Sequence, residues 1–269
     1  MESIIFILLP ISLLVVLVLG VWVFLEVAFG RPGGAAPTGR AQPDLPLLSG
    51  DALRQWATNK ARRVVAKYSK SPRKCSTASA LASEIEYLTE DIIAASVPWT
   101  LRGPLAQCER FSRDVISVSL PETLAIVETL RARLSGRELK KIRDRAQKNK
   151  EWLAVKDQSD NSPIATVCPL LLHDGCCITY ESRPVFCRGR CTNCIGNEDG
   201  LGTENERPDA TFAAAVGQGI TAGLTEGLTT AGLDGRLYEL NRALVGVLDV
   251  PDAAARWARG EVLLETGSS

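Results

Sequence analysis

The sequence lacks an excess of charge of either sign. Its 31 basic and 31 acidic residues balance over 269 positions, so overall charge does not indicate a nucleic-acid-binding protein, and we expect no nucleic-acid partner. The chain also lacks a glycine-rich phosphate loop of the Walker or dinucleotide type, and the Gly-x-Ser-x-Gly turn of α/β-hydrolases. These absences argue against the best-known nucleotide-binding and hydrolase sites.

An alternation of strands and helices is also missing, which argues against a doubly wound sheet or a β/α barrel. Apolar residues recur at helical spacing instead, and the sequence predicts an all-α body. Asp51 is a candidate cap for the first helix, Ser76 or Thr77 for the second, and Ser135 with Glu138 forms a capping box. The predicted helices cover residues 51–68, 77–97, 105–116, 124–134, 135–142, 209–228 and 237–248, with a short last one after Pro251.

One predicted helix, Asp209 to Leu228, has a face almost without side chains. Gly219, Gly223 and Gly227 recur every four residues, so we expect another helix to approach this face closely. Polar residues elsewhere on the helix argue against its being a membrane span.

The N-terminal run Ile4–Leu25 contains no charged residue and is long enough to cross a bilayer. A cleaved signal peptide is the alternative, but no basic residue precedes the run and no convincing cleavage site follows it. Arg31 and Arg40 lie after the run, which favours a single-pass protein of the inner (cytoplasmic) membrane with its N-terminus outside and its body in the cytoplasm. We expect an anchor at 1–29, a Pro/Gly-rich flexible linker at 30–46 and a helical domain at 47–269.

Six of the eight cysteines lie between Cys168 and Cys194, together with the only histidine, His173. Thiols at this density hold a metal ion or an iron–sulfur cluster, or they pair as disulfides. A cytoplasmic body would keep them reduced and so favours metal. Several thiolates repel one another, and the neighbouring arginines can offset their charge or donate hydrogen bonds to sulfur.

The order of residues in this loop is more specific than its composition. Cys168-Pro169-Leu170-Leu171 is followed by Gly175-Cys176-Cys177, by Tyr180-Glu181-x-Arg183-Pro184 and by Cys187-Arg188. This pattern resembles the YkgJ-like cysteine-cluster family, also called the CxxCxxCC family, of zinc- or iron-chelating proteins, which is related to the flagellin lysine-N-methylases. The resemblance implies that Cys168, Cys177 and Cys187 are metal ligands, with supporting roles for Tyr180, Arg183 and Arg188. Family members carry a further cysteine cluster upstream, where this chain has only Cys75 and Cys108.

Cys191 and Cys194 extend the loop, and either one could complete a set of four sulfur ligands. Their spacing from Cys187 also matches that of cysteines that hold a [4Fe–4S] cluster, so zinc and iron both stay open. Ligation by His173 or Cys176 is open as well, whereas Cys108 lies on an apolar stripe that is typical of a buried thiol.

Three functions are consistent with the sequence. They are a non-catalytic metal-binding protein, a metal-dependent protein lysine N-methyltransferase, and a disulfide-stapled extracytoplasmic domain.

Overall fold

The structure is a computed structural model that describes residues 50–70, 72–96, 115–156, 167–172, 175–190 and 208–264. Helices dominate these residues, and the predicted all-α class is confirmed at that level. The predicted span Ile4–Leu25 and the linker 30–46 lie outside the described residues. Within the described ranges, no helix combines the length and the apolar character that crossing a bilayer requires.

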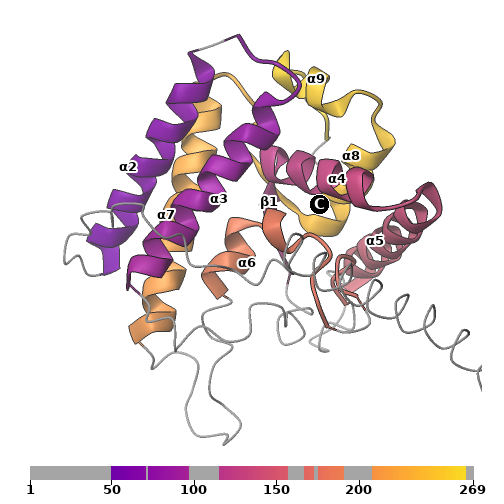
Figure 1. Cartoon of the computed structure of the whole chain (residues 1–269), viewed down its shortest axis with the longest axis horizontal. Coiled ribbons are helices and arrows are strands. Elements are labelled where there is room, and N and C mark those ends of the chain that lie inside the picture. The colour runs from indigo at the N-terminus through magenta and orange to yellow at the C-terminus, as the bar shows by residue number, and fades with distance from the viewer. Residues whose placement is uncertain are drawn as a thin grey trace, which may run out of the picture. The chain divides into compact units, whose positions relative to one another are not determined.

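Helices α2 (Gly50–Ser69) and α7 (Pro208–Thr230) pack side by side, as Figure 1 shows. The close approach that was predicted from the glycine stripe is confirmed. A Cβ atom on Gly219 or on Gly223 would come within 2.8 Å of the Cβ of Ala57 or Ala61, respectively, and would overlap a carbonyl oxygen of α2. Thr58 adds a hydrogen bond, because its Oγ1 donates to the carbonyl oxygen of Gly219 at 3.1 Å.

Helices α3 (Thr77–Ser96) and α4 (Leu120–Arg133) form the next layer and contact each other. The sequence offered Ser76 or Thr77 for the start of α3, and the helix begins at Thr77. The expected stop before Pro98 lies outside the described residues. Helix α4 begins with a capping box that the sequence analysis missed, in which the Ser119 amide donates to Glu122 Oε2 at 2.8 Å. One side of α4 faces α3 and another faces α8 (Leu240–Asp249), so most of its side chains are buried.

Two short strands, β1 (Ser117–Ser119) and β2 (Leu237–Glu239), pair antiparallel with Val118 opposite Tyr238. Two predictions are wrong here. Val115 and Ile116 are not helical but lead into β1, and the helix expected from Leu237 begins only at Leu240. The reason is the cap of α8, because the Glu239 carboxylate accepts hydrogen bonds from the amides of two residues in its first turn, which fixes the start of the helix there. The last helix, α9 (Ala253–Ala258), buries Trp257.

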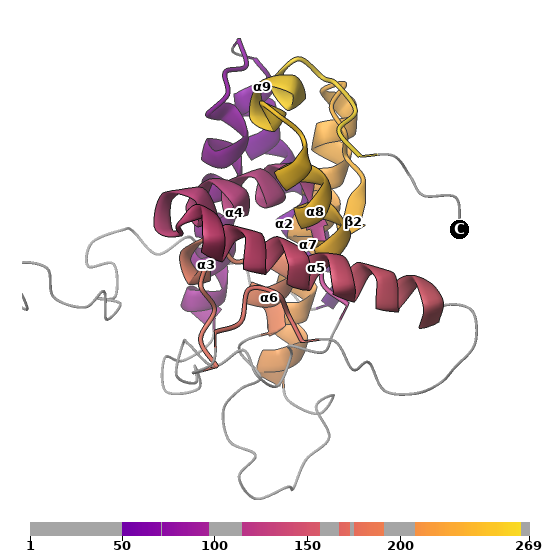
Figure 2. The same cartoon turned by 90° about the vertical axis from the view of Figure 1, so that its right-hand side faces the viewer.

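Helix α5 (Gly136–Lys156) runs across the body beside α8 (Figure 2). The predicted capping box at its start is confirmed, because the Ser135 amide donates to Glu138 Oε2 at 2.9 Å and the Glu138 amide donates to Ser135 Oγ at 3.4 Å. Arg143 fixes α5 to the end of α8 through two hydrogen bonds of 2.7 Å to the Asp249 carboxylate. The remaining elements, the 3-10 turn η3 (Tyr180–Ser182) and helix α6 (Val185–Arg190), belong to the cysteine loop.

Candidate metal-binding loop

The first part of the cysteine loop folds back on itself as a short hairpin. Leu171 and Cys177 form an antiparallel bridge, flanked by hydrogen bonds from the Leu172 amide to the Cys176 carbonyl at 2.8 Å and from the Ile178 amide to the Leu170 carbonyl at 2.9 Å. Gly175 has a φ of 77°, a conformation that glycine adopts without strain. The sequence analysis did not predict this hairpin.

The hairpin brings Cys168 close to Cys177. Burial raises the pKa of the Cys168 thiol to about 12, an amide hydrogen bond from Leu170 to its sulfur lowers the pKa, and the nearby Cys177 sulfur raises it. Cys177 Sγ in turn lies 3.6 Å from Thr179 Oγ1. At neutral pH the Cys168 thiol therefore keeps its proton, and a metal ion that binds there must displace it.

The other cysteines differ in position. Cys187 lies on α6, half-buried against the core, and Cys176 is half-buried in the hairpin. Cys75 is exposed just before α3. Cys191, Cys194, His173 and Cys108 lie outside the described residues. Among the residues that are described, no three Cys, His, Asp or Glu side chains form a group that could hold a metal ion. Of the five predicted sulfur ligands, Cys168 and Cys177 lie on the two arms of the hairpin, near enough for the charge of one to act on the other.

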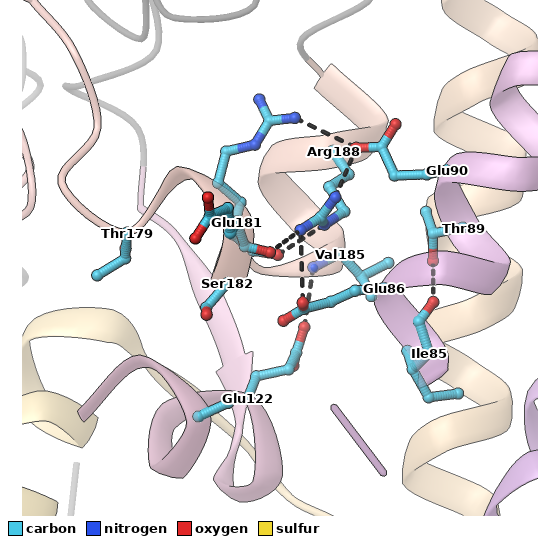
Figure 3. A network of polar contacts seen from close by, with 12 residues as sticks. Ile85, Glu86, Thr89, Glu90, Glu122, Thr179, Glu181, Ser182, Val185 and Arg188 are labelled. Atoms are coloured by element: carbon cyan, nitrogen blue, oxygen red, sulfur yellow. Dashed lines mark hydrogen bonds and ion pairs between the residues drawn. The ribbon is translucent and has the colours of Figure 1, made fainter. Parts of the chain in front are cut away.

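The second part of the loop is anchored by Arg188, whose side chain is almost fully buried (Figure 3). Its Nε donates to the carbonyl oxygen of Arg183 at 2.9 Å and its Nη2 to that of Glu181 at 2.6 Å. Its Nη1 donates to Glu90 Oε1 at 2.5 Å, and Nη2 lies 3.5 Å from Glu86 Oε2. One guanidinium thus ties two turns of the loop to helix α3.

Arg183 and Tyr180 complete the anchor. Arg183 is only 3% exposed, its Nη2 donates to Glu90 Oε1 at 3.3 Å, and its guanidinium stacks on the Tyr180 ring at 4.0 Å. Glu122 of α4 accepts a hydrogen bond of 2.8 Å from the Val185 amide at the start of α6. The three residues with expected supporting roles therefore connect the loop to α3, and the loop is also held by α4.

The sequence analysis missed the carboxylates that receive these arginines. Glu86 has the helical spacing of the buried residues Ala82, Thr89 and Ile93, and an acidic residue on such a stripe is a signal for a buried partner. Burial raises the pKa of Glu86 to about 8, the charge of Arg188 lowers it, and Glu122 raises it. Glu86 Oε1 has no hydrogen-bond partner among the described residues. Glu86 is therefore mostly protonated at neutral pH.

No family model matches the sequence, and neither the curated proteins nor the solved structures contain a match.

Proposed function

We propose that this chain is a membrane-anchored, non-catalytic metal-binding protein whose cysteine loop holds zinc or iron, the iron either as an ion or in an iron–sulfur cluster. The observation that carries this proposal is the pair of neighbouring thiols, Cys168 and Cys177, on a hairpin that donates an amide hydrogen bond to sulfur. Membership in the cysteine-cluster family is part of the proposal and is supported by the order of residues from Cys168 to Arg188.

The donors fit such a metal. Thiolate sulfur is a soft ligand that favours zinc, iron–sulfur clusters and copper(I) over magnesium or calcium. The amide of Leu170 stabilises negative charge on Cys168 sulfur, which is how second-shell donors support a metal thiolate. Two sulfurs are half of a four-sulfur site, and we assign the remainder to Cys187 with Cys191 or Cys194.

We assign a positioning role to the arginines. The guanidinium groups of Arg183 and Arg188 both donate hydrogen bonds to Glu90, and the negative charge of this carboxylate offsets part of their positive charge. The hydrogen bonds of Arg188 to the carbonyl oxygens of Glu181 and Arg183 fix the chain within η3 and directly after it, where α6 follows. In this proposal, Tyr180, Arg183 and Arg188 hold Cys187 at a set distance from the hairpin thiols.

The location follows from the sequence. The run Ile4–Leu25 would anchor the chain in the inner membrane, and the linker would leave the body in the reducing cytoplasm, where thiols stay free to bind metal. Reporter fusions after Pro46 test this topology. An alkaline phosphatase fusion that is active in the periplasm, together with a fluorescent-protein fusion that does not fluoresce, would contradict it.

Serine substitutions test the ligands. The full chain and its C168S and C177S variants are purified in detergent without oxygen, and metal per chain is measured by elemental analysis. We expect both variants to lose metal and to melt at a lower temperature, because metal binding at such a site stabilises the fold. The control is C75S, since Cys75 is exposed and lies outside the loop. Visible absorption separates an iron–sulfur cluster from colourless zinc. Full metal content in C177S would refute the assignment.

A further inference from the structure

A groove of about 540 Å³ lies between the cysteine loop and helix α5. Its floor is aliphatic and consists of Leu134 and Ile142 on one side and Leu171 and Ile178 on the other. Arg145 joins the two sides, because its Nη1 donates to the carbonyl oxygen of Leu171 at 3.1 Å. The groove is therefore built from the same hairpin that holds Cys168 and Cys177.

The α5 side of the groove carries most of the charge. Lys141, Arg145 and Lys148 line it together with Glu138 and Asp144. Over its whole length α5 has eight basic residues against three acidic ones, a net charge of +5. Neither Lys141 nor Lys148 forms an ion pair with another described residue, so both ammonium groups are available to a negatively charged ligand.

The loop side of the groove exposes apolar side chains. Leu172, which lines the groove, is 42% exposed, and Val167 at the base of the hairpin is 48% exposed. The carbonyl oxygen of Val167 accepts a hydrogen bond of 2.9 Å from Asn149 Nδ2, which holds this segment against α5. Exposed aliphatic residues beside an aliphatic floor and a basic rim are typical of a protein-binding surface.

We propose that this groove binds an acidic segment of a partner protein, with aliphatic side chains of the segment entering the groove and its carboxylates meeting Lys141 and Lys148. A nucleic acid fits less well, because the residues that line the groove include no aromatic ring for base stacking.

The groove is linked to the Cys168 thiol through Arg145. Arg145 lies close enough to Cys168 that its charge lowers the pKa of that thiol, and its side chain also lines the groove. An acidic segment that engages Arg145 would therefore offset a positive charge that acts on Cys168. The inference concerns a surface beside the thiols and does not depend on which metal they hold, or on whether they hold one.

Selection from a random peptide library tests the proposal. The full chain, in detergent, is immobilised and used to select peptides displayed on phage. We expect the selected peptides to combine Asp or Glu with Leu, Ile or Val, and to bind more weakly as salt increases. A fluorescent copy of the best peptide should bind the K141E/K148E variant about tenfold more weakly or worse, since two attractions become repulsions. L172S should weaken binding as well.

The matched control is K140E/K150E, which makes the same change of charge on the same helix outside the groove lining. It should bind the peptide as the unchanged chain does. Failure to enrich acidic peptides, or equal loss in both charge variants, would overturn the inference. Chemical acetylation of lysines, followed by mass spectrometry, tests whether lipid occupies the groove instead. If vesicles of anionic lipid protect Lys141 and Lys148 from acetylation and the selected peptide does not, the inference is also overturned.

Discussion

Replacing Gly223 by alanine should destabilise the protein, because the contact between α2 and α7 has no room for a methyl group. The added Cβ would overlap the carbonyl oxygen of Thr58 and lie 2.8 Å from the Cβ of Ala61. Backbone atoms cannot rotate away as a side-chain end can, so the two helices must separate. Overpacking of this kind costs about 1–3 kcal/mol. Separation also weakens the hydrogen bond from Thr58 to Gly219, which is worth about 1 kcal/mol.

Part of this cost is offset, because alanine favours the helix over glycine by about 1 kcal/mol. We therefore expect G223A to lower the free energy of unfolding by about 1–3 kcal/mol. Gly217 provides a matched control on the same helix. Its added Cβ would meet only ordinary contacts, at 3.5 Å from the Cα of Gly189 and 3.8 Å from the carbonyl oxygen of Val185. G217A should therefore leave stability unchanged or raise it by up to about 1 kcal/mol.

Urea unfolding followed by the helical circular dichroism signal measures both variants under one set of conditions. The comparison does not depend on the absolute stability of the chain, since the two variants share the substitution, the helix and the detergent. A G223A variant as stable as G217A, with the same denaturant slope, would refute the tight helix contact. It would show that α7 can shift along α2 at little cost.

Two further predictions concern the anchor of the cysteine loop. R188M should destabilise the protein by about 1–3 kcal/mol, because the carbonyl oxygens of Glu181 and Arg183 and the Glu90 carboxylate lose their buried hydrogen-bond donor. R133M removes an exposed pair with Glu181 and a hydrogen bond to the Ile178 carbonyl oxygen, and should cost less than about 1 kcal/mol. The pKa of Glu86, raised by burial from its ordinary 4.5 to about 8, should make the native protein retain a proton that the unfolded chain loses. Stability then falls as pH rises from about 4.5 to 8, and E86Q should flatten this fall in unfolding curves measured across that range. A slope unchanged by E86Q would contradict the assignment.

Local sequence signals predicted the helices well. The box of Ser135 and Glu138 and the cap expected at Ser76 or Thr77 depend on neighbours within a few residues, and α5 and α3 begin where these signals place them. The glycine stripe was also informative, because a face without side chains indicates close packing whatever the partner. The periodicity did not indicate which helix would pack there.

Features that depend on distant residues were not predictable. The strands β1 and β2 have three residues each, and Val118 pairs with Tyr238 far along the chain, so neither segment carries a strand pattern of its own. The role of Glu86 depends on Arg188 from another element, and no local spacing reveals this pairing. In the loop, the family pattern predicted Cys168 and Cys177 as metal ligands, and this stays a prediction, although both lie on the hairpin. Their proximity required the turn at Gly175, which a single glycine in a sequence does not specify.

The partnership of α2 and α7 has a consequence for how the protein is made. Thr58 and the residue to which it bonds are 161 positions apart, so the first helix of the body packs against one of the last to leave the ribosome. At 5–20 residues per second, α2 waits roughly 10–30 s with its small-residue stripe uncovered. During this interval the face of α2 that will contact α7 is exposed to solvent and to other chains. A chain that stops before residue 208 would leave α2 without its partner for good.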